Sequence, residues 1–304
     1  MAATLDPDYA KAVALLKEAG AEPADPLKMP LAEARKVQAR YFAFLKGTPP
    51  PVASVQEHTL EGPSGPFNIR IYFPSTSRPL PVLVFTRGAG WWAGNLESHD
   101  RTMRLLATKS GMAVCGVDYH CAPEARFPTQ RDELLAAIRW LRDAGKAAGL
   151  DSQRIVLMGE SAGATLSALA AASLKAQRLP QVSGLVLFYG NLAGPTAHTR
   201  EYSRWVWSNL LGTRELPPDP AAVPTEADLT GFPPTWLGVG ECDPLMSDSE
   251  AFADKLQAAG VPYTFKRYSG VPHAFVMMSR LYAGADAALD DAAAVARGFV
   301  ATRD

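Results

Sequence analysis

The chain has 304 residues, of which 47% are hydrophobic and 20% are charged. This composition is typical of an ordinary globular protein and excludes a disordered or fibrous one. The 30 basic and 31 acidic side chains give a formal net charge of −1, so the chain has no basic field to hold nucleic-acid phosphates or anionic lipids.

The first part of the chain predicts helices and then a hairpin. Apolar side chains recur at helical spacing between charges over residues 8–47, which indicates two amphipathic helices. Three prolines at 49–51 end this region. Two β-type runs follow, at 55–60 and 67–73, and the Gly-Pro-Ser-Gly stretch between them predicts a hairpin that opens a sheet.

From residue 80 onward, apolar runs alternate with segments of helical length. The apolar runs lie at 82–85, 113–117, 155–158, 185–188, 236–239 and 263–268. The helical segments lie at 131–147, 162–176, 249–258 and 285–300. This alternation predicts an α/β fold with a mainly parallel central sheet flanked by helices on both faces. Ligands of such sheets bind beyond the carboxyl ends of the strands.

The stretch from 190 to 232 interrupts the alternation with several prolines, Trp205 and Trp207, and no obvious strand. It predicts an insertion over the strand ends that serves as a lid or a pocket wall. No segment sustains the roughly eighteen apolar residues of a membrane-spanning helix. The N-terminus lacks the segments of a signal peptide, and three sparse cysteines predict reduced thiols, so we expect a cytoplasmic protein.

A candidate nucleophile lies between a predicted strand and a predicted helix. Residues 159–163 read Gly-Glu-Ser-Ala-Gly, directly after the run 155–158 and before the Ala-rich segment 164–176. A sharp turn between strand and helix exposes such a serine above the helix N-terminus. The pentapeptide also arises by chance, and the N-cap of an ordinary helix is the alternative for Ser161.

Two partners follow in the chain order of the α/β-hydrolases, which is serine, acid, histidine. Asp243 lies just past the run 236–239, and His273 lies just past the run 263–268. His273 would take the proton from Ser161, and Asp243 would orient and stabilise the imidazole. Singly, Asp243 could cap a turn and His273 could be an ordinary histidine, but the three together predict a catalytic triad.

A turn of small residues, Thr-Arg-Gly-Ala-Gly-Trp at 86–91, follows the run 82–85. Hydrolases with this order of catalytic residues take a backbone N–H from this loop. The amides of Ala89, Gly90 and Ala162 could therefore donate to the oxygen of a tetrahedral intermediate as an oxyanion hole. A plain glycine-rich turn is the alternative.

These residues resemble the hormone-sensitive-lipase group, family IV, of bacterial esterases in the α/β-hydrolase superfamily. The likeness runs from about residue 80 to 275 and rests on the segments 87–91 with 98–100, 117–124, 159–163 and 243–245 with His273. It implies a carboxylesterase that hydrolyses short- to medium-chain esters through an acyl-enzyme, without a cofactor. It also implies a supporting role behind the site for Asp118, Tyr119, Pro123 and Glu124.

The resemblance further implies how the chain divides into domains. Residues 1–50 would form an N-terminal helical cap segment, and residues 51–304 would form the catalytic domain, with 190–232 contributing to the cap. A small-molecule ester is the expected partner, with a homodimer left open.

The chain departs from the family's usual His-Gly-Gly-Gly motif at two positions. Ala89 keeps its N–H but restricts φ and narrows the site by a methyl group. Arg87 has two interpretations. Its guanidinium either binds an anionic or polar acyl substrate or holds the loop by pairing with a carboxylate such as Asp118 or Glu124.

Aromatic residues are candidates for the walls of an apolar pocket. The candidate pocket residues are Arg87, Trp91, Trp205 and Phe275, with Trp92 and Trp207 as further aromatics. The histidines match no zinc-type motif, so we expect no metal. Two alternatives stay open: a lactone, amide or carbamate hydrolase with the same triad, and a non-catalytic binding protein, like the plant gibberellin receptors that resemble this family.

Overall fold

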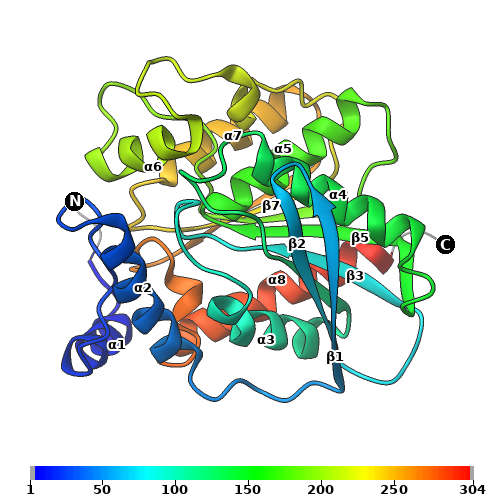
Figure 1. The fold of residues 1–304 in the computed structure, drawn as a ribbon, viewed down its shortest axis with the longest axis horizontal. Helices are drawn as coiled ribbons and strands as arrows, with labels where there is room; N and C mark the ends of the chain where they lie inside the picture. Colours follow the sequence, from blue (N-terminus) through cyan, green and yellow to red (C-terminus); the bar gives the residue numbers. More distant parts are fainter. Residues whose placement is uncertain (1–3, 302–304) are drawn as a thin grey trace.

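The computed structural model describes residues 4–301 and confirms the predicted α/β fold with its mainly parallel sheet (Figure 1). The eight strands follow the spatial order β1-β2-β4-β3-β5-β6-β7-β8. Their bounds are β1 (Ser54–Gly62), β2 (Gly65–Phe73), β3 (Leu80–Thr86), β4 (Ala113–Val117), β5 (Leu150–Glu160), β6 (Gly184–Phe188), β7 (Thr235–Gly240) and β8 (Tyr263–Tyr268). Each of the six apolar runs predicted after residue 80 falls inside one of these strands.

The sheet is antiparallel only at its first edge. β1 and β2 form the predicted hairpin, and β2 then pairs antiparallel with β4. All later pairings, from β4 and β3 through to β8, are parallel. The carboxyl ends of β5, β7 and β8 therefore lie at the same edge of the sheet, where the three triad candidates follow them.

Helices cover both faces of the sheet, which is why its inner strands are apolar along their whole buried length. α4, α5 and α7 lie on one face, and α3 and α8 lie on the other (Figure 1). The helices are α1 (Pro7–Glu18), α2 (Leu31–Lys46), α3 (Asp100–Ser110), α4 (Thr129–Asp143), α5 (Ala162–Ala176), α6 (Glu201–Leu211), α7 (Met246–Ala258) and α8 (Ala283–Ala301). None of the helices within residues 4–301 is long and apolar enough to cross a bilayer.

Some element bounds differ from the sequence prediction. β5 starts five residues before the predicted run 155–158, because an apolar run marks only the buried part of a strand. α4 ends at Asp143, four residues before the predicted end. α3 is missing from the prediction, although Met103, Leu106 and Ala107 have helical spacing and are buried.

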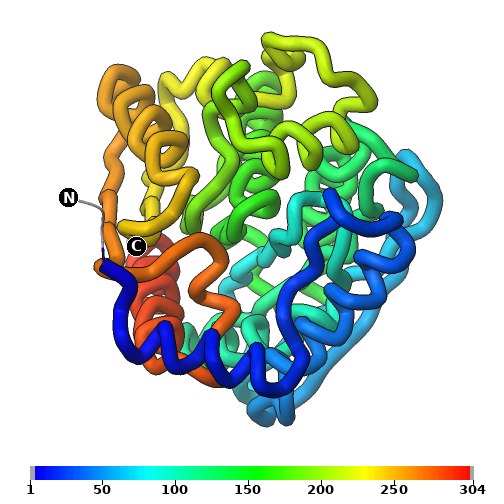
Figure 2. Tube along the Cα trace, turned by 90° about the vertical axis from the view of Figure 1, so that its left-hand side faces the viewer, coloured from blue at the N-terminus to red at the C-terminus, as the bar shows by residue number. Residues whose placement is uncertain are grey.

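The two N-terminal helices run across one end of the molecule, beside the segment that follows β8 (Figure 2). The Asp6 N–H donates to the Gly270 carbonyl at 2.7 Å. The rings of Tyr9 and Tyr282 meet edge to face, with centroids 5.4 Å apart. These contacts connect the start of the described chain to the loop that leads to His273.

Candidate active site

Ser161 occupies the sharp turn between β5 and α5, with φ of +53° and ψ of −122°. A left-handed φ costs a non-glycine residue energy, and such strain is common at functional sites. The flanking glycines make the turn sterically feasible. A Cβ on Gly159 would lie 2.2 Å from the Gly163 carbonyl oxygen, and one on Gly163 would lie 1.9 Å from that of Thr86. The local sequence therefore allows this turn only with glycine at both positions.

The three triad candidates meet in one line of hydrogen bonds. Ser161 Oγ lies 2.8 Å from His273 Nε2. On the other side of the ring, His273 Nδ1 lies 2.9 Å from Asp243 Oδ2 and 3.1 Å from Oδ1. Asp243 is 5% exposed, and its Oδ1 also accepts the Leu245 N–H at 2.7 Å. This is the geometry that proton transfer from a serine to an imidazole requires.

The surroundings of His273 set its protonation. Burial opposes its charged form, but the carboxylate of Asp243 outweighs this effect, so the pKa of His273 is raised above its usual 6.5. Tyr189, the residue after β6, packs its ring against the imidazole with centroids 4.9 Å apart. Sequence reasoning did not single out Tyr189, because a tyrosine after a strand gives no distinctive signal.

The loop after β3 holds three consecutive residues at positive φ: Ala89 at 70°, Gly90 at 57° and Trp91 at 62°. Alanine thus adopts the left-handed conformation that the family motif leaves to glycine, at a cost of roughly 1–2 kcal/mol. The backbone turns of residues 4–301 do not use the N–H groups of Ala89, Gly90 or Ala162. Their use as oxyanion donors is therefore compatible with the backbone hydrogen bonds of the described residues.

A buried carboxylate beside the nucleophile connects to this loop. Glu160 is 2% exposed, and its Oε1 accepts the Gly88 N–H at 2.5 Å and lies 3.2 Å from His99 Nε2. His99 Nδ1 in turn lies 2.7 Å from Ser98 Oγ. A Cβ on Gly88 would approach Glu160 Oε1 to 2.2 Å. The resemblance included Ser98 and His99 but implied no role for them. The contacts of His99 with Ser98 and Glu160, and that of Glu160 with the Gly88 N–H, make Glu160 a positioning residue for the loop.

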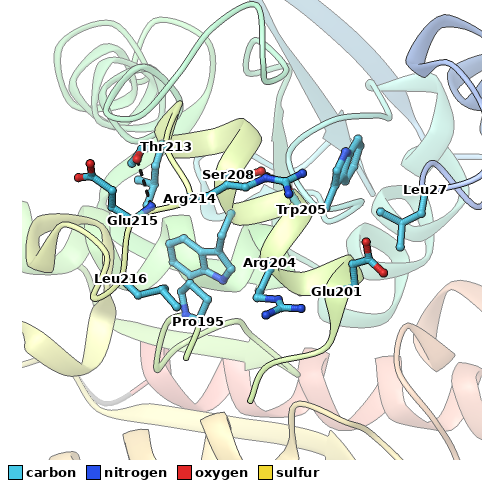
Figure 3. Close-up of a pocket in the computed structure, with 12 residues that line it drawn as sticks. Leu27, Pro195, Glu201, Arg204, Trp205, Ser208, Thr213, Arg214, Glu215 and Leu216 are labelled. Carbon is cyan, nitrogen blue, oxygen red and sulfur yellow. Dashed lines mark hydrogen bonds between the residues drawn. The ribbon is translucent and has the colours of Figure 1, made fainter. Parts of the chain in front are cut away.

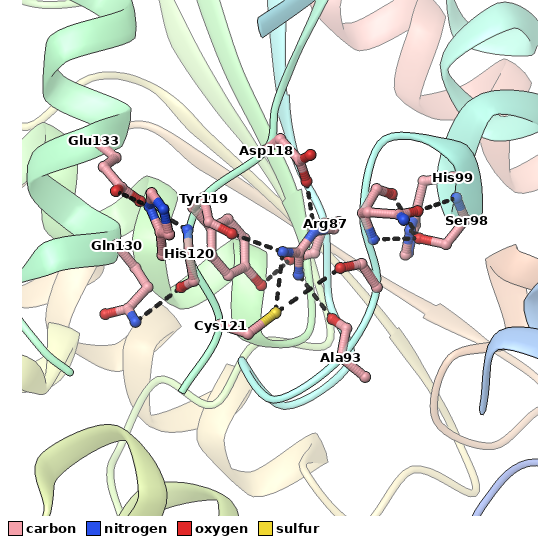
Figure 4. Close-up of polar contacts among 12 residues, drawn as sticks. Arg87, Ala93, Ser98, His99, Asp118, Tyr119, His120, Cys121, Gln130 and Glu133 are labelled. Carbon is pink, nitrogen blue, oxygen red and sulfur yellow. Dashed lines mark hydrogen bonds and ion pairs between the residues drawn. The ribbon is translucent and has the colours of Figure 1, made fainter. Parts of the chain in front are cut away.

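Arg87 is directed behind the loop, among backbone carbonyls (Figure 4). Its guanidinium donates to the carbonyls of Ala93 and Tyr119, each at 2.8 Å, and to Cys121 Sγ at 3.4 Å. It also stacks over the Tyr119 ring, 3.8 Å from the ring centroid. Only 3% of Arg87 is exposed. These contacts fit the loop-holding interpretation rather than the substrate-binding one.

The carboxylates suggested as partners of Arg87 behave differently. Asp118 Oδ1 lies 3.9 Å from Arg87 Nε. Burial raises the pKa of Asp118, and Arg87 opposes that rise. Glu124 instead forms a two-pronged ion pair with Arg35 of α2, at 2.7 and 2.8 Å. Tyr119, which the resemblance also placed behind the site, donates its hydroxyl to the Arg87 carbonyl at 3.0 Å.

The predicted pocket residues lie in different places. Trp91 is fully buried and donates its indole N–H to the Ala162 carbonyl at 3.1 Å, directly beside the nucleophile. Phe275 is also fully buried, and its ring packs against Tyr189 with centroids 5.8 Å apart; Tyr189 in turn contacts His273. Trp205 of α6 is half-buried and lines a cavity of about 260 Å³ together with Leu27, Arg204 and Leu216 (Figure 3).

A second carboxylate near the triad comes from α7. Asp248 accepts the Ala193 N–H at 3.1 Å and so ties the first turn of α7 to the connection between β6 and α6. The pKa of Asp248 is raised to about 6, mainly by burial and also by Asp243, while the backbone N–H of Ala193 and His273 oppose the rise. Sequence patterns do not distinguish Asp248 from an ordinary acidic residue in the first turn of a helix.

A mainly parallel sheet with serine, histidine and aspartate in hydrogen-bonding contact at its carboxyl edge defines a serine hydrolase. A family model described as an alpha/beta hydrolase fold matches residues 83–277, and the chain belongs to that family. The predicted fold, the resemblance to family IV esterases and the serine-hydrolase class are confirmed.

Solved esterase structures are similar over almost the whole chain. The hyperthermophilic esterase of the archaeon Pyrobaculum calidifontis is 29% identical, with a TM-score of 0.89 over 97% of this chain and 98% of that one. A thermostable carboxylesterase cloned from a metagenomic library is 30% identical, with a TM-score of 0.85 over 90% and 99%. A thermostable esterase from Pseudomonas putida is 25% identical, with a TM-score of 0.85 over 98% of both chains.

Proposed function

We propose that the protein hydrolyses carboxylic esters with short to medium acyl chains through an acyl-enzyme on Ser161. The observation that carries this proposal is the unbroken line of hydrogen bonds from Ser161 through His273 to Asp243. The esterase names of the similar structures support the ester as substrate class.

In the proposed reaction His273 Nε2 accepts the Ser161 proton as Oγ attacks the ester carbonyl carbon. Asp243 keeps the Nδ1 proton directed toward itself and stabilises the imidazolium. The N–H groups of Ala89, Gly90 and Ala162 donate to the developing oxyanion, where loss of one donor costs on the order of 3 kcal/mol. His273 then protonates the leaving alcohol, and water, activated by the same imidazole, releases the acid. The reaction requires no metal or cofactor, and their absence stays a prediction.

The cap assignment is also a proposal. Residues 1–50 and 190–232 would form the cap over the catalytic domain 51–304. Arg35 of α2 supports this assignment, because it donates to the carbonyls of Trp92 and Ala122, both in segments that follow sheet strands. The contacts of α6 with the loop after β3 support it for the insertion.

The compartment and the assembly are further proposals. Cytoplasmic residence agrees with the absence of any disulfide among residues 4–301. A homodimer is proposed as the assembly, and size-exclusion chromatography with light scattering tests it directly. A mass of one chain, 32.6 kDa, at micromolar concentration would reject the dimer.

A substrate panel tests the ester hydrolysis. The p-nitrophenyl esters from acetate to dodecanoate are compared with matched amides and lactones, and Ser161→Ala serves as the blank. We expect hydrolysis of acetate to hexanoate esters well above the blank and little turnover of amides. Preferred turnover of an amide or lactone, or wild-type rates equal to the blank, would contradict the proposal.

A further inference from the structure

His99 is a buried histidine that takes no part in the proposed proton transfers. It directly precedes α3 and is only 2% exposed. Its ring contacts the rings of Phe42 of α2 and Phe85 of β3, with centroids 5.4 and 5.9 Å away. These contacts restrict the orientation of the imidazole. Its two nitrogens therefore face fixed partners, Ser98 at Nδ1 and Glu160 at Nε2.

The hydroxyl of Ser98 determines the protonation of Nδ1. Ser98 Oγ lies 2.7 Å from His99 Nδ1 (Figure 4). It also lies 2.6 Å from the Asn95 carbonyl oxygen and accepts the Asn95 N–H at 2.9 Å. Because a carbonyl oxygen can only accept, two oxygens this close need the single hydroxyl proton between them. Ser98 Oγ then has only a lone pair for the imidazole, so Nδ1 of His99 carries a proton and donates it.

The other ring nitrogen faces a buried carboxylate. Glu160 Oε1 lies 3.2 Å from His99 Nε2 and accepts the Gly88 N–H at 2.5 Å. Such a short contact with a backbone N–H is typical of an ionised acceptor. A bare lone pair on Nε2 would repel this oxygen, so Nε2 also carries a proton. Within residues 4–301, His99 is the one basic side chain within 4.0 Å of the Glu160 carboxylate, and a charged ring there balances the buried negative charge.

We propose that His99 is a positioning residue for the loop after β3 and acts as an imidazolium ion paired with Glu160. The inference rests on the proposed ester hydrolysis and concerns the geometry of its oxyanion donors. Glu160 holds the start of the loop through the Gly88 N–H, and Ser98 holds its end through the backbone of Asn95. His99 joins these two side chains and so fixes the segment whose N–H groups are the proposed donors.

The expected effect of losing His99 follows from the role of the loop. Removing an oxyanion donor outright lowers kcat by about 10²–10³-fold. His99→Phe keeps a ring of similar size and displaces the loop without removing an N–H, so we expect a smaller loss, about 30-fold, in both kcat and kcat/KM. KM should stay within about twofold of the wild type, because the donors act on the transition state.

His99→Gln is the conservative variant. Its amide N–H can reach Glu160 in place of Nε2, although it carries no charge. We therefore expect partial rescue, with kcat lowered only about fivefold. A residue that served only to fill space would give no rescue, because the glutamine side chain fills the space of the ring less well than phenylalanine does.

The experiment measures steady-state kinetics on p-nitrophenyl butyrate in the wild type, both His99 variants and a matched control. The control is His58→Phe, because His58 is a half-buried histidine of β1 that contacts the Trp140 ring, with centroids 4.5 Å apart. Inhibition by a trifluoromethyl ketone is measured alongside, because addition of Ser161 to this ketone forms a tetrahedral oxyanion. Its inhibition constant should rise in His99→Phe by the same factor as kcat/KM falls. Circular dichroism melting identifies variants that are folded.

A second measurement examines the charge of the ring in the wild type and needs no variant. Long-range nitrogen–proton correlation spectra at neutral pH report whether each imidazole nitrogen carries a proton. The signals of His99 are assigned through nuclear Overhauser contacts with the ring protons of Phe42 and Phe85. We expect both nitrogens of His99 to be protonated. An unprotonated nitrogen would overturn the ion pair with Glu160.

The outcomes separate this inference from the proposed function. Unchanged kinetics in folded His99→Phe, an equal loss in His58→Phe, or a change of KM alone overturns the positioning role while leaving ester hydrolysis intact. If His99→Phe does not fold, the kinetics of His99→Gln and the spectra of the wild type decide the question. Wild-type activity equal to that of Ser161→Ala on every ester would instead reject the proposed function itself.

Discussion

The imidazole of His273 lies between a hydroxyl that must lose a proton and a carboxylate that favours the charged ring. Because the carboxylate outweighs burial, the pKa of His273 lies above 6.5 in the folded protein. A general base must be neutral, so activity is lost as pH falls through this pKa. The acid limb of the pH profile therefore reports on the Asp243 contact.

We predict that kcat/KM for a neutral ester rises with pH, with a midpoint above 6.5. In Asp243→Asn the charge that raises the pKa of His273 is removed, so the midpoint moves to lower pH. Catalysis also falls by about 10⁴-fold, the size reported for removing such a charge from a triad. Stopped-flow or steady-state pH profiles measure both effects. An unmoved midpoint in the variant would mean that Asp243 does not act on His273.

Among single elements, the loop after β3 depends on what holds it from behind. Arg87 links the carbonyls of Ala93 and Tyr119, and Glu160 accepts the Gly88 N–H. Buried carbonyls that lose their donor cost about 1–3 kcal/mol each. The geometry of the oxyanion donors therefore rests on side chains that do not touch the substrate.

We predict that Arg87→Ala lowers the stability of the protein by about 2–6 kcal/mol, because two buried carbonyls lose their donor. We also predict that kcat/KM falls by a similar factor for neutral esters and for esters with a distal carboxylate. Urea unfolding and kinetics on a matched ester pair measure these effects, with Arg178→Ala, a surface arginine, as control. A loss confined to the anionic ester would restore the substrate-binding interpretation of Arg87.

The connection from β6 to α6 gives a second prediction at this scale. The pKa of Asp248 is raised from 3.8 to about 6, so the folded protein binds this proton more tightly than the unfolded chain. Its contribution to stability therefore falls as pH rises from about 4 to about 6. Relative to the wild type, Asp248→Asn should gain up to about 3 kcal/mol between pH 4 and pH 7.

Urea titrations of both proteins at several pH values check this prediction. Asp254→Asn, on the exposed side of the same helix, provides the control for a general charge effect. A difference between wild type and Asp248→Asn that is constant from pH 4 to pH 7 would show that Asp248 has an ordinary pKa. The pairing of Asp248 with the Ala193 N–H would then have no electrostatic consequence.

At the scale of the whole molecule, sequence patterns predicted the structure wherever a physical rule relates residues that are close together along the chain. The apolar runs located the inner strands β3 to β7, because buried parallel strands leave no polar alternation. The triad was predictable because each member follows a strand, and parallel strands end at one edge. The sharp turn at Ser161 was predictable because it requires glycine at 159 and 163 for steric reasons.

Contacts between distant segments were not predictable. The direction of the Arg87 guanidinium depends on the carbonyls of Ala93 and Tyr119, which no local pattern brings to it. The pairing of Glu124 with Arg35 rather than with Arg87 joins residues 89 positions apart. The edge-to-face contact between Trp91 and Trp207 likewise joins two distant segments. Read singly, their tryptophans are indistinguishable from core residues.

The most direct test of the account is labelling with a fluorophosphonate followed by intact mass spectrometry and peptide mapping. We predict a single adduct on Ser161 in the wild type, no adduct in Ser161→Ala, and labelling slowed by several orders of magnitude in His273→Ala. An unlabelled wild type, or an adduct on a serine other than Ser161, would contradict the claim that Ser161, His273 and Asp243 form one catalytic unit.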